Sequence, residues 1–238
     1  MGKTRTLISL YIKILILYKM SNYHASVINY MFNKYNLVDP LYLEIGVWSG
    51  STFKNVNSIN KDGVDTEQYC SSPYVNYKMS SDTFFERHIT KKYDFIFIDG
   101  LHTAFQVTKD IYNSIKNLNN GGIIMIDDIY PHSKYEQEAL DLRKVGPNTG
   151  DVWKAIYNII DTLEKISQEI FFIKDNGRGN LVCKIKPNND INIYIDPSIP
   201  TKNTDGRYTG NDKEWNKYEY DTDFIKYESR LMKYYKKI

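Results

Sequence analysis

Residues 93–131 read YDFIFIDGLHTAFQVTKDIYNSIKNLNNGGIIMIDDIYP. Two continuous apolar runs, residues 95–98 and 123–126, are typical of strands buried on both faces of a parallel sheet. Between them, apolar residues recur every three or four positions over residues 104–118 and predict an amphipathic crossover helix, which Gly121 and Gly122 would end. The stretch therefore predicts a strand, helix and strand unit of an α/β fold.

Acidic residues follow both predicted strands. Asp99 follows the first, and Asp127 and Asp128 follow the second. Parallel strands end at the same edge of a sheet and lie about 4.8 Å apart, so the three carboxylates are expected to converge. An all-oxygen cluster suits a hard divalent ion such as Mg²⁺. The alternative is that Asp99 caps the following helix, and that Asp127 and Asp128 are solvated loop acids.

The composition indicates a folded protein but no function. A chain of 238 residues with 42% hydrophobic content suits one large α/β domain with appendages. Its net charge of +2, from 31 basic and 29 acidic side chains, gives no field that favours nucleic acid or an anionic membrane. Cys70 and Cys183 lack metal-ligand spacing, which favours a reducing compartment, the cytoplasm.

The chain is expected to have three parts: an N-terminal helical extension (1–40), a core (41–187) and a C-terminal tail or lid (188–238). Within residues 1–20, an apolar stretch interrupted by Lys13 is too short for a membrane span. No small-residue cleavage site follows it. We therefore expect this stretch to pack on the core or to form a contact in a homo-oligomer, without stable membrane insertion.

A glycine turn follows the first predicted core strand, residues 41–45. It reads EIGVWSGST, and the spacing of Gly46 and Gly50 departs from the GxGxxG dinucleotide fingerprint, which disfavours nicotinamide binding. Asp65 ends the sequence GVD about twenty residues later, where an acid usually accepts hydrogen bonds from ribose hydroxyls. Together the turn and the acid predict a nucleoside ligand.

Further elements complete the predicted sheet. A short strand at residues 77–79 would place Ser81 and Asp82 at the ligand edge, where Asp82 could reach an adenine amino group, cap the next helix, or serve in both roles. Residues 169–174 and 181–185 predict an antiparallel hairpin. The whole pattern predicts a doubly wound, mostly parallel seven-stranded α/β sheet with an antiparallel C-terminal hairpin.

Over residues 41–187, these segments resemble the class I S-adenosylmethionine-dependent methyltransferases, in particular the macrocin-type sugar O-methyltransferases. The similar pieces are YLEIGVWSGST, GVD, MSSDTFF, YDFIFIDGLHT, GGIIMIDDIYP and GDVWKAI. The resemblance implies cofactor contacts at nine positions: Glu44, Gly46, Trp48, Gly50, Ser51, Asp65, Ser81, Asp82 and Asp99. Trp48 departs from the family, which usually has a small residue in the middle of this loop.

The resemblance also implies a metal site and a general base. Mg²⁺ would be held by Asp99, Asp127 and Asp128, and His102 would be a neutral imidazole with an unperturbed pKa that takes the proton of the acceptor hydroxyl. The expected function is S-adenosylmethionine-dependent, magnesium-assisted O-methylation of a sugar or glycoside. The cofactors are then S-adenosyl-L-methionine and Mg²⁺, and the partner is a small-molecule or glycan acceptor.

Other functions remain open at this point. A catechol- or phenol-type O-methyltransferase would share the metal acids and differ in its acceptor pocket. A nucleic-acid methyltransferase is disfavoured by the small net charge and by the sequence IDGL, where amine-modifying enzymes of this fold carry an Asn- or Asp-Pro-Pro motif. The third possibility is a scaffold without catalysis, against which the complete set of acids and His102 argues.

Overall fold

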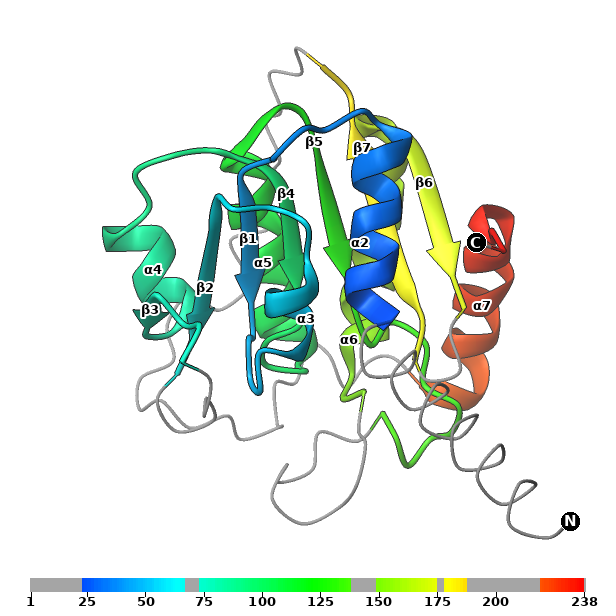
Figure 1. Cartoon of the computed structure of the whole chain (residues 1–238). Helices are drawn as coiled ribbons and strands as arrows, with labels where there is room; N and C mark the ends of the chain where they lie inside the picture. Colours follow the sequence, from blue (N-terminus) through cyan, green and yellow to red (C-terminus); the bar gives the residue numbers. More distant parts are fainter. Residues whose placement is uncertain (1–22, 67–72, 138–148, 175–177, 188–218, 238) are drawn as a thin grey trace, which may run out of the picture.

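The computed structural model describes residues 23–66, 73–137, 149–174, 178–187 and 219–237. The expectations for residues 1–20, for Cys70 and for most of the tail lie outside these ranges. A single seven-stranded sheet runs through the centre of the molecule (Figure 1). Among the residues that the structure describes, no helix is both long enough and apolar enough to cross a membrane.

The sheet has the strand order β3-β2-β1-β4-β5-β7-β6. Its strands are β1 (Tyr42–Ile45), β2 (Lys61–Asp65), β3 (Tyr77–Lys78), β4 (Tyr93–Ile98), β5 (Leu118–Ile126), β6 (Ser167–Ile173) and β7 (Asn180–Ile185). The pairs from β3 across to β5 are parallel, whereas β7 is antiparallel to both β5 and β6. This topology confirms the predicted doubly wound, mostly parallel sheet with an antiparallel hairpin.

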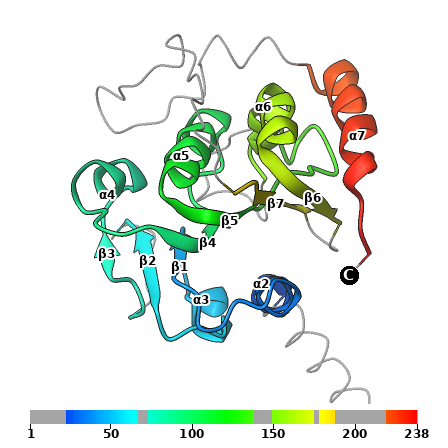
Figure 2. The same ribbon diagram turned by 90° about the horizontal axis from the view of Figure 1, so that it is seen from above.

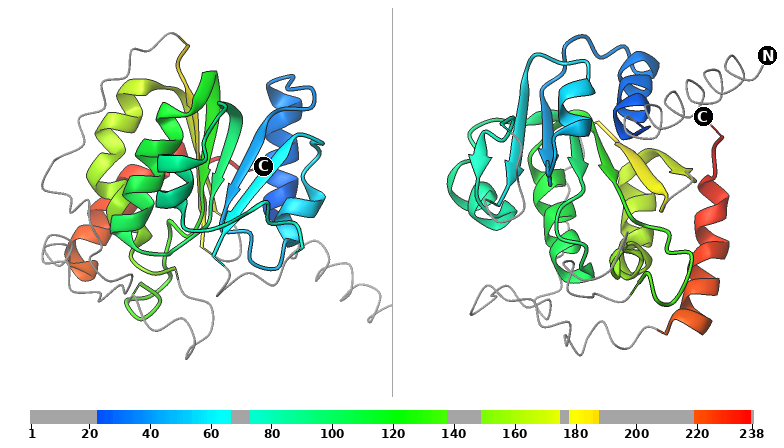
Figure 3. Two further views of the ribbon diagram at one scale, coloured as in Figure 1. Left: turned by 90° about the vertical axis from the view of Figure 1, so that its left-hand side faces the viewer. Right: turned by 60° about the horizontal axis from the view of Figure 1, so that its bottom comes forward.

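Helices cover both faces of the sheet (Figures 2 and 3). They are α2 (Tyr23–Lys34), α3 (Ser51–Asn55), α4 (Ser81–Arg87), α5 (Ala104–Lys116), α6 (Val152–Ile166) and α7 (Ile225–Leu231), the last flanked by the short turns η2 (Tyr220–Phe224) and η3 (Met232–Tyr234). On β4, Phe95 and Phe97 belong to the core under α2, while Ile96 and Ile98 belong to the core under α5 and α6. The apolar run of β4 is continuous because both faces are buried.

One predicted boundary is wrong. Helix α5 ends at Lys116, Asn117 is its C-cap and Leu118 already begins β5, so Gly121 and Gly122 do not terminate the helix. Gly121 lies within β5 with φ +73°, in the stretch where the pairing of β4 with β5 shifts register. A left-handed residue inside a strand is typical of such an irregularity, and it produces the same glycine signal as a helix C-cap.

The C-terminal segment 219–237 packs at the β6 edge, beside α6 (Figure 3, right). Phe224, Tyr227 and Leu231 are buried in the same core cluster as the α6 side chains. The Tyr227 hydroxyl donates a hydrogen bond to the carbonyl oxygen of Ile129, 2.9 Å away, in the loop that follows β5. This part of the tail therefore supports a loop at the carboxyl edge of the sheet.

Candidate functional site

The carboxyl ends of β4 and β5 place three acids at one edge of the sheet. Ile98 and Ile126 are paired in register, and Asp99 and Asp127 come directly after them. Thr103, not Asp99, caps α5 by accepting a hydrogen bond from the Gln106 N–H. Asp127 and Asp128 are 8% and 1% exposed. The alternative of a capping acid and two solvated loop acids is therefore wrong.

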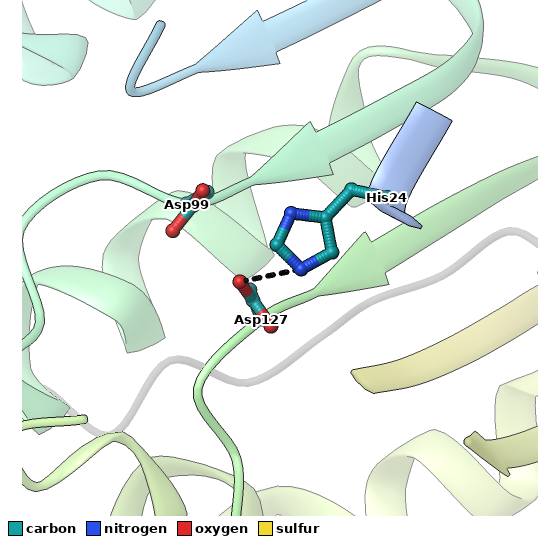
Figure 4. A group of neighbouring side chains, drawn as sticks. All are labelled: His24, Asp99 and Asp127. Carbon is teal, nitrogen blue, oxygen red and sulfur yellow. Dashed lines mark ion pairs between the residues drawn. The ribbon is translucent and has the colours of Figure 1, made fainter. Parts of the chain in front are cut away.

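The backbone separates the two adjacent acids. Asp128 has a left-handed φ of +60°, and the two carboxylates have different partners. Asp127 Oδ2 lies 3.1 Å from His24 Nε2 of α2 (Figure 4), whereas Asp128 Oδ2 lies 2.9 Å from His102 Nε2. Such a backbone conformation in a non-glycine residue costs about 1–3 kcal/mol and is often found at functional sites.

Among the residues that the structure describes, two groups of three side chains can present metal ligands. Within each group the ligand atoms lie within 4.8 Å of one another. The groups are His24, Asp99 and Asp127, and Asp99, His102 and Asp128. Within the described part of the chain, the three predicted acids do not form such a group by themselves. They meet at one edge as two groups that share Asp99.

His102 lies between two carboxylates. Its Nε2 is 2.9 Å from Asp128 Oδ2 and 3.5 Å from Asp99 Oδ1. Burial lowers its pKa, but the charges and hydrogen bonds of Asp128 and Asp99 outweigh burial and raise the pKa well above the ordinary 6.5. The expectation of an unperturbed pKa is therefore wrong, because the two carboxylates favour the protonated imidazole.

Asp128 is the main counter-ion of this histidine. Burial raises its pKa, but the positive charges of His102, Arg178 and His24 outweigh burial and lower it. Arg178 approaches from the loop before β7, with its Nη1 3.4 Å from Asp128 Oδ1. A buried carboxylate held by two cationic side chains stays ionised.

The start of α6 holds the loop that carries His102. Gly150 has φ +54°, and a Cβ there would lie 1.7 Å from the carbonyl oxygen of His102, so only glycine allows this contact. The next residue, Asp151, accepts a hydrogen bond from the backbone N–H of Ala104 at 2.7 Å. The segment GDVWK (150–154) therefore packs against the loop that begins with DGLH (99–102).

The glycine turn after β1 lies against the end of β4. Gly46 has φ +88°, and a Cβ there would lie 1.9 Å from the carbonyl oxygen of Asp99. Asp65, at the end of β2, accepts hydrogen bonds from the backbone N–H groups of Trp48 and Thr66, each at 2.7 Å. Trp48 is 70% exposed and has φ +44°, the backbone region that favours glycine. The structure therefore brings the turn, Asp65 and Asp99 together.

Other predicted cofactor residues lie at the same loop. Gly50 precedes α3 with φ +75°, and Ser51 is the first residue of that helix. Glu44 is only 1% exposed and accepts a hydrogen bond from the Tyr42 hydroxyl at 2.5 Å. Burial, opposed by that hydrogen bond and assisted by the charge of Asp99, raises the pKa of Glu44 to about 8. Burial is the main cause of this rise in pKa, and the nearby Asp99 carboxylate adds to it.

The predicted adenine side is tied to α5. Ser80, not Asp82, caps α4, since its side chain accepts a hydrogen bond from the Thr83 N–H, so the capping alternative for Asp82 is wrong. The Gln106 side chain donates to Ser81 Oγ and to Asp82 Oδ1, both at 3.1 Å. Lys109 forms an ion pair with Asp82. These contacts fix Ser81 and Asp82 at the carboxyl edge.

Sequence reasoning did not find His24 or Arg178. His24 belongs to α2 and Arg178 to the turn between β6 and β7, and neither adjoins a strand end that carries an acid. The only sequence feature that could have indicated His24 is the small number of histidines. The chain has four, and two of them contact the edge acids.

Several solved structures resemble this chain. One is an O-methyltransferase from Bacillus cereus in complex with SAH, with 16% identity over 71% of this chain and 81% of that chain and a TM-score of 0.48. Another is the Streptomyces achromogenes O-methyltransferase TomG in complex with SAM, with 12% identity over 68% of this chain and 79% of that chain and a TM-score of 0.47. A third is the MycE methyltransferase of the mycinamycin pathway in complex with Mg, SAH and mycinamycin VI, with 15% identity over 70% of this chain and 50% of that chain and a TM-score of 0.41.

The sequence itself matches a known family. No curated protein matches the chain. Residues 43–129 match the model of a family described as a methyltransferase domain. The matched range runs from β1 to the loop after β5, and it contains the glycine turn, Asp65 and the three edge acids. Residues 43–129 of this chain are therefore similar to that methyltransferase family.

Proposed function

We propose that the protein is an S-adenosylmethionine-dependent O-methyltransferase that uses a divalent metal ion and acts on a hydroxyl of a sugar or glycoside. The observation that carries the proposal is the convergence, at one edge of the sheet, of the glycine turn with Asp65 and of Asp99 with His102. The glycine turn and Asp65 can bind a nucleoside, and Asp99 and His102 can bind and deprotonate an acceptor hydroxyl. Gly46 joins the two halves, because its turn rests on the backbone of Asp99.

The donor half of the site would orient the cofactor. S-adenosylmethionine supplies an electrophilic methyl group, whose bond to sulfur breaks as a bond to the acceptor oxygen forms. Asp65 offers carboxylate oxygens to the ribose hydroxyls, and the hydrogen bond from Trp48 fixes its position. Ser81 and Asp82, held by Gln106, lie where the adenine side is expected. Orientation of this kind can supply much of the rate.

The acceptor half of the site would remove the proton of the acceptor hydroxyl and stabilise the charge that develops on its oxygen. The donor set of imidazoles and carboxylates within 4.8 Å fits a divalent ion. Such an ion, bound at Asp99, would lower the pKa of the acceptor hydroxyl, hold its oxygen in place and offset the charge that raises the pKa of His102. The hydroxyl proton passes to His102 Nε2, and Asp128 stabilises the resulting imidazolium.

The preference for a sugar over a catechol or phenol rests on the segments DGLH and GDVWK. They meet where Gly150 contacts the carbonyl of His102 and Asp151 accepts from Ala104. Both acceptor classes would use the same acids, so the acceptor pocket decides between them. Nothing in the charge of +2 favours nucleic acid.

Replacing Asp65 by asparagine tests the donor half. The variant keeps the shape and loses the charged acceptor for two ribose hydroxyls, so affinity for S-adenosylhomocysteine is expected to fall by about tenfold to a hundredfold. Isothermal titration calorimetry measures this change. Asp161→Asn is the matched control, because Asp161 is an exposed acid of α6 that pairs with Arg230. Binding that is unchanged in Asp65→Asn would remove the ribose assignment.

A further inference from the structure

We propose that His24 is a metal ligand together with Asp99 and Asp127, and that this site binds Mn²⁺ more tightly than Mg²⁺. The inference rests on the proposed metal-assisted function and deepens it in two ways. It adds a ligand from α2, which lies outside the residues 43–129 that match the methyltransferase family. It also assigns different tasks to the adjacent acids: Asp127 binds the metal, and Asp128 serves His102.

The geometry of the three side chains suits a cation. The ligand atoms of His24, Asp99 and Asp127 all lie within 4.8 Å of one another, and His24 Nε2 is 3.1 Å from Asp127 Oδ2. In an octahedral site with bonds of about 2.1 Å, neighbouring ligand atoms are about 3 Å apart. Figure 4 shows the imidazole reaching from the start of α2 to the ends of β4 and β5, with a carboxylate from each strand beside it.

Packing holds the imidazole in this position. Helix α2 docks on the sheet through an apolar stripe of Val27, Ile28, Met31 and Phe32, all buried. His24 lies at the end of this helix near the edge acids, and its ring lies against Phe97 with 5.3 Å between centroids. Phe97 is two residues before Asp99 on β4, so the same strand supports the imidazole and carries a carboxylate. Such preorganisation reduces the entropy lost when a metal binds.

The charged neighbours of Asp127 and Asp128 also indicate different roles for these two acids. The carboxylate of Asp128 already has two cationic partners, His102 and Arg178. It is also 1% exposed and bound to the histidine that the mechanism uses. Asp99 and Asp127 follow neighbouring parallel strands, and the His24 imidazole lies beside both carboxylates. A divalent cation is the partner that would balance this pair of carboxylates.

The nitrogen ligand sets the metal preference. Mg²⁺ favours carboxylate oxygens and water, whereas imidazole suits first-row transition metals. Mn²⁺ accepts carboxylates and imidazole in the same octahedral geometry. A site with one imidazole and two carboxylates should therefore bind Mn²⁺ more tightly than Mg²⁺, and this preference should be smaller in a site of aspartates alone.

The test is to titrate the full chain, stripped of metal by a chelator, with Mn²⁺ or Mg²⁺ in the absence of cofactor and acceptor. Calorimetry should give the tighter binding for Mn²⁺, and pulsed EPR of bound Mn²⁺ should detect a directly coordinated imidazole nitrogen. His24→Ala should abolish the nitrogen signal and weaken Mn²⁺ binding by about tenfold to a hundredfold or more, since even supporting residues around metal sites cost that much. His24→Gln should give the same loss of nitrogen signal with less change in packing.

Two other histidines provide the controls. His88 is exposed at the end of α4, and His88→Ala should change neither the Mn²⁺ affinity nor the nitrogen signal. His102→Ala should keep the signal, because His102 serves Asp128 in this proposal. A signal that persists in both His24 variants, a signal lost in His102→Ala, or no Mn²⁺ binding by the intact chain would overturn the inference. Failure to bind S-adenosylhomocysteine, with the nitrogen signal intact, would contradict only the proposed function.

Discussion

Replacing His102 by alanine is expected to lower kcat by about 100-fold or more, since general-base catalysis typically contributes 10²- to 10⁴-fold. The imidazole Nε2 lies 2.9 Å from Asp128 and 3.5 Å from Asp99, at the edge where the acceptor hydroxyl would bind. Affinity for S-adenosylhomocysteine should stay near that of the intact protein, because Asp65 and the glycine turn are unchanged. Steady-state kinetics and calorimetry separate the two effects.

The role of His102 as a base also predicts how kcat changes with pH. Only the neutral imidazole can accept a proton, and Asp128 and Asp99 raise the pKa of His102 above 6.5. In the intact enzyme kcat should therefore rise with pH through the pKa of His102, and this acidic limb should vanish in His102→Ala. The exposed His88 provides a control variant, His88→Ala, with an unchanged profile. Retention of full kcat and of the limb by His102→Ala would assign proton removal to another group.

Gly46→Ala is expected to have a large effect on stability. Alanine would place its Cβ 1.9 Å from the Asp99 carbonyl oxygen and would have to adopt φ +88°. The left-handed conformation alone costs about 1–2 kcal/mol, and relief of the overlap must move either the turn or the end of β4. The free energy of unfolding should therefore fall by about 3 kcal/mol or more, a large part of the 5–15 kcal/mol typical of a domain. Urea denaturation measures the loss.

Gly121 provides the matched control for this substitution. Its φ of +73° is similar, but a Cβ there would meet only Pro187 and Lys184 side-chain atoms at 3.7 and 3.9 Å, ordinary contact distances. Gly121→Ala should therefore cost only the backbone penalty, about 1–2 kcal/mol. Equal losses in the two variants would mean that the contact between Gly46 and Asp99 is not what limits substitution in the turn.

Much of the sheet could be predicted because burial on both faces leaves a strong pattern. The continuous apolar runs of β4 and β5 and the aspartates that end them indicate buried parallel strands without any knowledge of their neighbours. The end of α5 could not be predicted, because Gly121 has a left-handed φ both in a helix C-cap and in an irregular strand. The register shift that decides between them involves Tyr93 and Phe95 on another strand.

The site could be predicted where it follows the strand ends and not where it depends on packing between distant segments. Asp99, Asp127 and Asp128 come directly after β4 and β5, so topology alone brings them to one edge. His24 reaches that edge only because α2 docks across the sheet, which no local spacing reveals. The raised pKa of His102 depends on which carboxylate faces it, and this follows from the left-handed turn at Asp128.

Transfer of a ¹³C-labelled methyl group from S-adenosylmethionine would reveal both the reaction and the acceptor atom. The intact protein, with Mn²⁺ or Mg²⁺ present, is incubated with glycosides, catechols and RNA, and the labelled product is identified by NMR and mass spectrometry. We expect a labelled methyl group on a sugar hydroxyl oxygen, with one S-adenosylhomocysteine formed for each methyl group transferred. Transfer to a nitrogen of RNA, or equal transfer with Asp65 and His102 both replaced by alanine, would contradict it.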